Sequence, residues 1–342
     1  MFKPTKRKSL AAVAGACIAM FSAPSANAYV YALSHLEVKD FTLNISPTLA
    51  TAVAGFSFDL SNTASMLGSS SVNPLSAASC GGSIALNNCG TSPVLDAAMA
   101  NAPPSNLFRS ENNFSFLGAN GVNSYSGSDS VINTAELVTG TPTSLNQIAE
   151  SLLNTNGQAR SNSEIQSNTS LSITFTIASG AGPATLDLSF MADADQRTEI
   201  FGAVGSYLAQ SNMNASITLS KDGGGTIGWT PQGNGIVINN CDASSMAGAT
   251  CSETFDTTDL NNNVSAFTNP STRSNSFDVA NIFTAFGIHI EGLLAGDYTV
   301  ALNSLTSTSI SRTVPEPGSL ALIGVALLGL GFVSTKRQTK QA

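Results

Sequence analysis

The chain has 342 residues, of which 11% are charged, and its net charge at pH 7 is −8. Residues 29–313 hold seven cations against 21 acidic residues, so this segment, long enough for one large domain or two ordinary ones, has a net charge near −14. Nucleic acids and anionic lipid surfaces are bound through clustered lysine and arginine, and the charge argues against both as partners. Serine, threonine, asparagine and glycine supply the polar surface instead, and such a surface can hydrogen-bond to sugars.

The first 28 residues have the three parts of a secretory signal peptide in order. Four cations among the first eight residues precede the apolar stretch Leu10–Phe21, and Ala26 and Ala28 stand at the positions that signal peptidase reads. We expect cleavage after Ala28, which makes Tyr29 the mature N-terminus. A lipoprotein cleavage site at Cys17 is the alternative, and it is disfavoured because the apolar stretch continues past that cysteine.

Alternation of apolar and polar residues with period two dominates residues 29–305. The pattern predicts strands at 56–60, 171–177, 186–190, 215–219 and 298–305. Glycine-rich turns separate these runs, at 179–183, 222–225 and 233–235. Helical periodicity is scarce, and Thr143–Leu153 is predicted as a short helix. We therefore expect an all-β body, an antiparallel β-sandwich of jelly-roll-like type.

Two segments of the body lack strong periodicity. Residues 61–130 are rich in serine, asparagine, glycine and proline, which predicts long loops or an irregular insertion rather than a separate domain. Residues 306–314 are mostly serine and threonine, and we expect them to form a linker.

Four cysteines, Cys80, Cys89, Cys241 and Cys251, remain after signal cleavage and fall in two close pairs. An even number in an exported chain indicates disulfides, and loop closure favours the local pairs 80–89 and 241–251 over the long-range alternatives. The first pair would staple the insertion at 61–130. Zinc is disfavoured because neither close Cys-x-x-Cys spacing nor nearby histidine is present.

Carboxylates supply the best candidates for ligand chemistry. Asp193 and Asp195, with Glu199 nearby, could hold calcium through oxygen ligands at the end of a strand, although the EF-hand spacing is missing. Asp242, Asp256 and Asp259 form a second, looser group. Solvated surface carboxylates are the alternative for both groups, and a carboxylate pair for glycoside hydrolysis is a further one. No other cofactor is expected.

The aromatic residues and histidines have structural interpretations beside their functional ones. Leu294–Tyr298 resembles a tyrosine corner, with sugar stacking by Tyr298 as the alternative. Trp229 is either a core aromatic or a sugar platform. His289 is out of phase with its apolar neighbours and should face solvent. His289 or His35 could belong to a Ser–His–Asp triad on paper, but no positioned nucleophile supports one, and we expect no enzyme activity.

The C-terminus holds a short extended peptide, an apolar segment and a cationic end. Pro315 and Pro317 keep Glu316 in an extended stretch, since each fixes its own backbone and disfavours helix before it. Residues 318–335 carry no charge, and a helix of this length covers about 27 Å, close to a hydrocarbon core of about 30 Å. Three cations follow, which places the tail end in the cytoplasm and the body outside the inner membrane. A buried core helix is the disfavoured alternative.

This tripartite end, Pro315-Glu316-Pro317 followed by one hydrophobic segment and a Lys/Arg tail, resembles the PEP-CTERM sorting signal over about residues 315–340. The resemblance implies a Gram-negative bacterium that makes exopolysaccharide. It also implies recognition by an exosortase, a membrane-embedded cysteine transpeptidase or protease that removes the tail. The inner membrane would then be a transient partner of the precursor.

Together these features predict an exported cell-surface or matrix protein that is structural and associated with exopolysaccharide. Two alternatives stay open: a secreted carbohydrate-binding β-sandwich that uses calcium, and a secreted glycosidase or esterase.

Overall fold

The computed structural model describes residues 28–313 except for 48–49, 59, 75–77, 82–93, 104–106, 120–122, 134–142, 156, 166–170, 181, 203–205, 269–272 and 278–280. Ala28–Thr313 forms one compact unit. All of the elements in this part of the chain are strands, and they pair in antiparallel fashion. The all-β prediction is therefore confirmed for the described residues.

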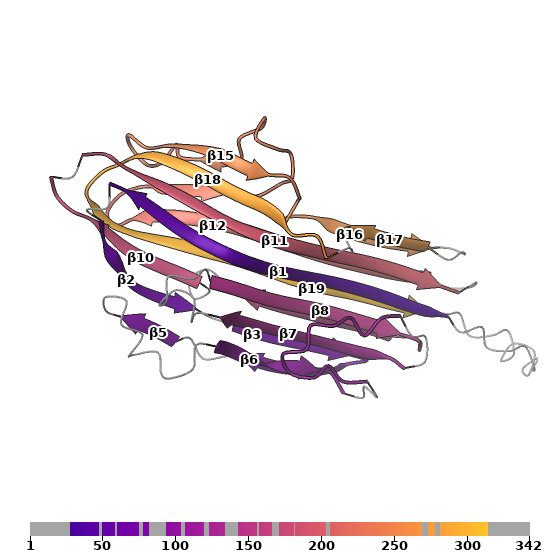
Figure 1. Ribbon diagram of the computed structural model, residues 1–342. Coiled ribbons are helices and arrows are strands. Elements are labelled where there is room, and N and C mark those ends of the chain that lie inside the picture. The colour runs from indigo at the N-terminus through magenta and orange to yellow at the C-terminus, as the bar shows by residue number, and fades with distance from the viewer. Residues whose placement is uncertain are drawn as a thin grey trace, which may run out of the picture. The chain divides into compact units, whose positions relative to one another are not determined.

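The strands form two sheets (Figure 1). Sheet A contains, in spatial order, β15 (Thr250–Asp256), β18 (Thr284–Leu293), β11 (Ala184–Phe201), β1 (Tyr29–Ser46), β8 (Thr143–Leu153), β7 (Tyr125–Asn133) and β6 (Val94–Asn101), and β17 (Arg273–Phe277) also pairs with β11.

Sheet B contains, in order, β14 (Cys241–Asp242), β13 (Thr226–Trp229), β12 (Ser206–Lys221), β19 (Gly296–Thr313), β10 (Leu171–Ile177), β2 (Ala50–Phe58) and β5 (Ala78–Gly81). Off this path, β16 (Asn263–Thr268) pairs with β12, β9 (Gly157–Ile165) pairs with β19 and β3 (Leu60–Met66), and β4 (Ser69–Pro74) pairs with β3.

The strand order combines runs of adjacent hairpins with connections that cross between the sheets. β6, β7 and β8 follow one another as neighbours in sheet A, and β12, β13 and β14 do the same in sheet B. Adjacent hairpins of this kind form meanders, whereas a jelly roll is built from Greek-key crossings between the sheets. The two-layer antiparallel arrangement is confirmed for the described residues. Other connections do cross between the sheets, among them β1 to β2, β11 to β12 and β18 to β19, so the jelly-roll-like type stays a prediction.

One part of the space between the sheets is filled by large apolar side chains. Phe190 of β11 stacks on Phe286 of the same sheet with ring centroids 5.0 Å apart, and its centroid lies 6.0 Å from that of Trp229 in sheet B. Inward positions of β12 and β19 add buried leucine, isoleucine and valine. Each fully buried side chain of this size contributes roughly 1.5–3 kcal/mol, so this apolar core drives the packing of the two layers.

Another part of the interface between the sheets is polar. Ser34 of β1 donates to the Asn212 carbonyl of β12 at 2.8 Å, and the hydroxyls of Ser151 and Thr308 lie 2.9 Å apart across the sheets. Further cross-sheet hydrogen bonds join Ser211 to the Leu33 carbonyl, Ser128 to the Thr63 carbonyl, Ser130 to Asn62, and Ser304 to Gln147. We call these residues the hydroxyl seam. Their hydrogen bonds offset the cost of burying polar groups.

The described body begins and ends at the same pole of the sandwich. Tyr29 of β1 pairs with the last residue of β11, and Thr313 of β19 pairs with the first residue of β12. Only residues 202–205 lie between those two partners in the sequence. We call this the terminal pole, because the first and last strands of the described body begin and end there.

The opposite end of β12 and β19 is the distal pole. There Lys221, the last residue of β12, pairs with Tyr298 near the start of β19. β12 has 16 residues, and at about 3.3 Å per residue the two poles of this strand are roughly 50 Å apart.

The predicted helix at Thr143–Leu153 is wrong, because this segment is strand β8. β8 lies between β1 and β7, and both of its faces are covered. Leu145 and Leu153 face the other sheet, while Ile148 and Leu152 are buried on the outward face beneath residues 107–119. A strand buried on both faces loses the polar–apolar alternation, and the spacing of its apolar residues here imitated a helix.

The predicted linker at 306–314 is also wrong over its described part, since β19 continues to Thr313. Thr306, Thr308 and Ile310 are buried in alternation with partly exposed neighbours. The period-two pattern was present, but threonine occupies inward positions where an apolar residue was expected. The body therefore ends at Thr313 rather than at residue 305.

The described part of the expected insertion at 61–130 is largely regular structure. Strands β3 to β7 occupy much of this range and pair within the two sheets. The buried row of β3 includes Asn62 beside Ala64 and Met66, so a polar residue interrupts its apolar periodicity. Among the described residues of the range, 107–119 form no strand and cover the outward face of sheet A.

Candidate functional site

The sorting peptide Pro315–Pro317 and the apolar segment 318–335 lie outside the described residues, as does Ala26. Ala28 is described, is buried and comes immediately before β1. No helix in the described part of the chain is long and apolar enough to cross a membrane. Because β19 ends at Thr313, a single residue separates the last strand from Pro315.

Cys241 and Cys251 form a disulfide with their Cα atoms 5.7 Å apart, which confirms that predicted pair. Cys241 lies on β14 of sheet B and Cys251 on β15 of sheet A, both at the edges of their sheets. The bond therefore ties the two layers together along one side of the sandwich. Cys89 lies outside the described residues, so the pair Cys80–Cys89 stays a prediction.

The three calcium candidates on β11 do not converge on one point. Asp193 and Asp195 are both buried, and Asp195 Oδ2 lies 3.3 Å from His35 Nδ1. Glu199, four residues further along the strand, accepts hydrogen bonds from the Tyr29 hydroxyl and from Arg197. Among the described residues there is no group of three His, Cys, Asp or Glu that could hold a metal ion.

Each member of the looser carboxylate group holds a turn. The buried Asp256 accepts from the backbone N–H groups of Gln232 at 3.1 Å and Gly233 at 3.0 Å. Asp242 accepts from Ser244 N–H at 2.8 Å, and this hydrogen bond lowers the pKa of the Asp242 carboxyl. Asp259 accepts from Asn261 N–H at 2.7 Å. These carboxylates fix the loops between β13 and β16.

Trp229 is a core aromatic rather than a sugar platform. Its side chain is 1% exposed, and its Nε1–H donates to Glu253 Oε1 at 2.7 Å. Burial raises the pKa of the Glu253 carboxyl, and the neighbouring Asp256 adds to the rise. The indole is therefore unavailable for stacking on a ligand.

Both histidines have carboxylate or amide oxygens at their two ring nitrogens. His289 faces the polar side of β18, as predicted, with Nδ1 2.5 Å from Asp187 Oδ1 and Nε2 3.1 Å from Glu291 Oε1. These hydrogen bonds raise the pKa of the His289 imidazole. His35 is buried, with Nδ1 facing Asp195 and Nε2 2.9 Å from Asn146 Oδ1. Neither ring presents a free nitrogen to a substrate.

A buried charge cluster on the outward face of sheet A was not foreseen from the sequence. Its centre is Glu150 of β8, which is fully buried. Glu150 accepts hydrogen bonds from Tyr31 at 2.7 Å, Tyr125 at 3.0 Å, Arg109 Nη2, Leu117 N–H at 3.0 Å and Gly118 N–H at 2.8 Å. Burial, with the Glu150 carboxylate next, raises the pKa of both tyrosines well above the usual value. We call Glu150, Arg109, Tyr31 and Tyr125 the Glu150 clamp.

The clamp holds residues 107–119 against the sheet. Arg109 Nη1 donates to the carbonyls of Asn113 at 2.6 Å and Ser115 at 3.2 Å, and the Asn101 side chain bonds the Arg109 backbone in both directions at 2.9 Å. Because protein groups already engage both carboxylate oxygens of Glu150, the cluster is structural. The sequence offered only local hints of it: Arg109 directly follows the apolar pair Leu107–Phe108, and Glu150 lies among the apolar residues of β8.

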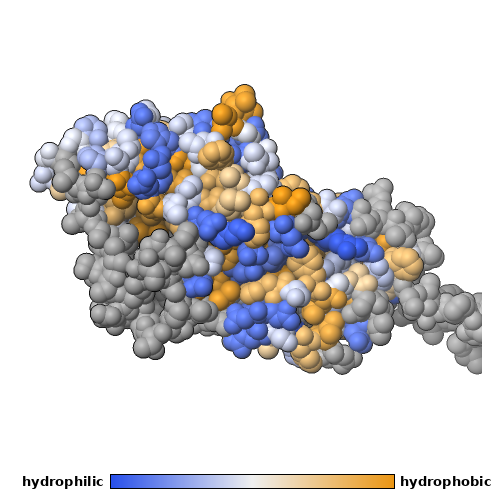
Figure 2. Space-filling model, in the orientation of Figure 1, coloured by the Kyte–Doolittle hydropathy of each residue, from blue (hydrophilic) through white to orange (hydrophobic). Residues whose placement is uncertain are grey.

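An exposed apolar loop follows β13. Ile236, Val237 and Ile238 are 62%, 90% and 59% exposed. The loop is anchored, because Gly235 N–H donates to the Asp256 carbonyl at 2.7 Å and the disulfide follows at Cys241. Figure 2 shows a hydrophobic projection at the upper edge of the molecule, where Figure 1 draws the loops beside β15. Aliphatic side chains held in solvent in this way are typical of a contact surface.

The distal pole carries a pocket of about 380 Å³, within the range usual for small-molecule sites. Three segments line it, namely the turn at 221–225, the loop at 245–247, and residues 292–298. Tyr298 forms the predicted tyrosine corner there. Its hydroxyl donates to the Leu294 carbonyl at 2.5 Å, and its ring stacks on Phe175 with centroids 5.4 Å apart. Tyr298 is 2% exposed, which excludes it as a stacking platform for sugars.

Comparison with protein families adds the deciding observation about the tail. Residues 313–337 match the family model of the PEP-CTERM protein-sorting motif. The chain carries a PEP-CTERM motif. This motif is associated with exosortase processing and indicates an exported protein, made as a membrane-anchored precursor and sorted by its C-terminus. No curated protein and no solved structure matches the chain. The match covers 25 residues at the tail and does not include the sandwich.

Proposed function

We propose that the chain is a non-enzymatic surface or matrix protein, delivered by its PEP-CTERM motif and associated with exopolysaccharide. The match at residues 313–337 is the observation that carries the proposal. In this account the signal peptide is removed after Ala28, the apolar segment 318–335 holds the precursor in the inner membrane, and an exosortase-type enzyme releases the body near Pro315–Pro317.

The position of the chain ends supports this sequence of events. β1 begins at Tyr29 and β19 ends at Thr313, and both residues lie at the terminal pole. A body tethered from that pole keeps the distal pole, roughly 50 Å away along β12, directed away from its tether. Processing beside Thr313 would leave every described strand intact.

The state of the titratable groups supports a non-enzymatic body. A general base needs a free lone pair within reach of a substrate proton. Both ring nitrogens of His35 and His289 already face protein oxygens, and the Glu150 carboxylate is enclosed by donors. The carboxylates Asp242, Asp256 and Asp259 hold turns.

The sorting proposal is tested by replacing Pro315 and Pro317 together with alanine and following the protein in fractionated cells of a host with active sorting. We expect the variant to stay in the inner-membrane fraction at full length while the wild type leaves it. Ser309→Ala, on the sheet just before the motif, is the matched control and should be sorted normally. Equal release of the double variant and the wild type would contradict the proposal.

The non-enzymatic assignment has its own test. The purified protein is assayed on panels of glycosidase and esterase substrates, beside Glu253→Gln and His289→Gln variants. We expect no turnover above background for any of the three. Turnover by the wild type that either substitution abolishes would establish an enzyme instead.

A further inference from the structure

The pocket at the distal pole is built from backbone that approaches closely. At Gly225 an added Cβ would lie 1.8 Å from the Ser245 carbonyl oxygen, so the turn at 222–225 packs directly on the loop at 245–247. At Gly296, with φ of +146°, an added Cβ would lie 2.7 Å from Lys221 Cε. A side chain at residue 296 would therefore displace the lysine from the pocket. These contacts fix the walls and leave space for the Lys221 side chain.

Lys221 brings a positive charge that forms no ion pair into this pocket. No carboxylate of the described residues lies within 4 Å of its Nζ, and its recorded partner is the Tyr298 ring, 5.5 Å from Nζ. The neighbouring Asp297 instead accepts from the Thr176 hydroxyl at 2.5 Å. Lys221 is also the sole cation of the sequence between Arg197 and Arg273, so it is the one side chain of that segment that can pair with an anion. An ammonium that forms no ion pair within the protein is available to a carboxylate of a ligand.

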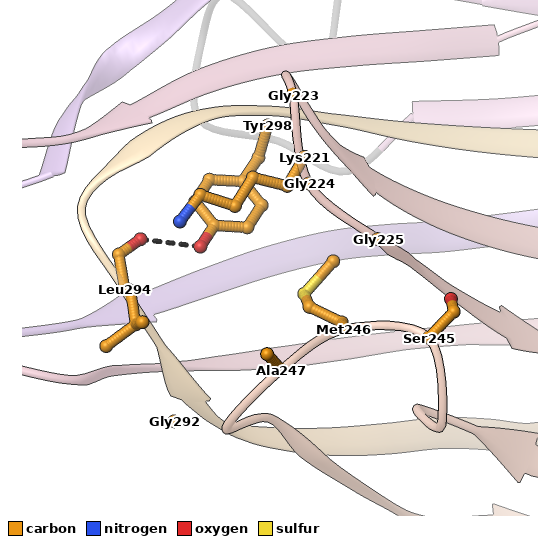
Figure 3. Close-up of a pocket in the computed structure, with 10 residues that line it drawn as sticks. All are labelled: Lys221, Gly223, Gly224, Gly225, Ser245, Met246, Ala247, Gly292, Leu294 and Tyr298. Carbon is orange, nitrogen blue, oxygen red and sulfur yellow. Dashed lines mark hydrogen bonds between the residues drawn. The ribbon is translucent and has the colours of Figure 1, made fainter.

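The rest of the lining is largely apolar or backbone. Figure 3 shows the Lys221 ammonium beside the Tyr298 ring, between the glycine turn and Leu294, with Met246 and Ala247 across the space. Leu294 is 49% exposed, so part of its side chain is free to contact a ligand. Tyr298 is held by its hydrogen bond to Leu294 and by its stacking on Phe175, so the wall beneath the lysine is rigid.

We propose that this pocket binds a small organic anion whose carboxylate pairs with Lys221 and whose less polar face rests on the exposed part of Leu294. A charge-assisted contact of this kind orients the ligand, and the apolar wall selects against compact inorganic anions. A monosaccharide that bears a carboxylate fits this description. The proposal does not depend on the sorting of the tail, because all of its residues belong to the body.

The test is isothermal titration calorimetry on the full chain in detergent micelles, with glucuronate, glucose and inorganic phosphate as probes. We expect saturable binding of glucuronate at one site per chain, and binding of glucose and of phosphate at least tenfold weaker. Raising the ionic strength should weaken glucuronate binding, since the ion pair is partly open to solvent.

Two variants and one control locate the site. Lys221→Gln should weaken glucuronate binding at least tenfold, and Leu294→Ser should weaken it severalfold while the backbone carbonyl that Tyr298 uses is kept. The matched control is Lys39→Gln, because Lys39 Nζ also lies over an aromatic ring, 3.2 Å from the Phe283 centroid, but outside the pocket. Its affinity should equal that of the wild type.

Each contrary outcome overturns a stated part of the proposal. Absence of saturable glucuronate binding, or unchanged binding by a folded Lys221→Gln variant, would overturn the site. If glucose bound as tightly as glucuronate, the charge of Lys221 would not contribute to binding. If phosphate bound as tightly as glucuronate, the apolar wall would not contribute to selectivity. Thermal melting of each variant shows that it is folded before its affinity is compared.

Discussion

Glu150 is the residue whose substitution should affect stability most at the level of single side chains. Its carboxylate is the shared acceptor for Arg109, Tyr31 and Tyr125 in a site without solvent. Removing one partner of a buried ion pair leaves the other charge uncompensated, so we expect Glu150→Ala to lower the free energy of unfolding by about 3–5 kcal/mol. Urea denaturation measures this change.

Glu111 provides the control for that prediction. It is exposed and lies in the same covering segment, so Glu111→Ala should change the free energy of unfolding by no more than about 0.5 kcal/mol. Similar losses for both variants would show that the clamp does not hold residues 107–119 to the sheet.

His289 should make stability depend on pH in a defined direction. Its hydrogen bonds to Asp187 and Glu291 raise the pKa of the folded imidazole above its usual value of 6.5. A raised pKa means that the folded state favours the proton, so the stabilisation is complete below pH 6.5 and is lost as pH rises through the folded pKa. The groups are partly exposed, so the effect should be small and should shrink in high salt.

The measurement is urea denaturation of the wild type and His289→Gln between pH 5.5 and 9. The difference in unfolding free energy should favour the wild type at the acidic end and decline toward zero with rising pH. A difference that is constant, or that grows with pH, would contradict the assigned ion pair. Subtracting the two proteins cancels the pH dependence that they share.

Single residues differ in how far the sequence could predict them. The tyrosine corner at Tyr298 and the outward-facing His289 followed from local spacing, because each depends on neighbours within a few residues. The Glu150–Arg109 pair joins residues 41 positions apart. No local pattern specifies such a pair, since it forms only after β8 and the covering segment have met.

At the scale of elements, the disulfide Cys241–Cys251 should stabilise the open side of the sandwich. It joins an edge strand of each sheet, the two-residue β14 and the seven-residue β15. Closing a loop this short stabilises by about 2–3 kcal/mol in the chain-entropy model. We expect the double variant Cys241→Ser, Cys251→Ser to lose about that amount in urea denaturation without reductant.

Reductant supplies the matching control. It should lower the stability of the wild type to that of the double variant and leave the double variant itself unchanged, apart from any contribution of Cys80 and Cys89. If the double variant were as stable as the oxidised wild type, the disulfide Cys241–Cys251 would not contribute to the free energy of unfolding.

The end of β19 distinguishes a strand from the linker that its composition suggested. Thr308 is buried and pairs with Ser211 on one side and Ser161 on the other, so β19 is an interior strand at this point. Thr308→Pro removes a backbone donor there, at a cost of about 1–3 kcal/mol for each partner left unpaired. Thermal melts of both variants measure this loss of stability. Thr313→Pro, at the exposed end of the strand, should change the stability little. If Thr308→Pro left the stability unchanged, residues 306–313 would behave as the predicted linker rather than as an interior strand.

Strands with one solvent-exposed face could be predicted from the sequence, and strands covered on both faces could not. β10, β11 and β12 show apolar residues in alternation with polar ones and were recognised from that pattern. β8 has a second buried face under residues 107–119, and the end of β19 places threonine in the hydroxyl seam. In both, a partner distant in sequence determines which side chains are buried, so composition alone misassigned them.

At the scale of the whole molecule, the two poles of the sandwich have different tasks in this account. The terminal pole receives both ends of the body, and the PEP-CTERM motif begins where β19 ends. The distal pole carries the Lys221 pocket. The motif was predictable because it is local and ordered along the chain. The pocket was not, because its three lining segments come together only when β12 and β19 pair.

The central claim is that the chain is exported and then processed at its C-terminus. The most direct measurement is the intact mass of the mature protein, with sequencing of its C-terminal peptide, from cells with active sorting. The account predicts a chain that starts at Tyr29 and lacks the apolar segment 318–335 and the cations after it. A dominant species that retains Ala342 would contradict it.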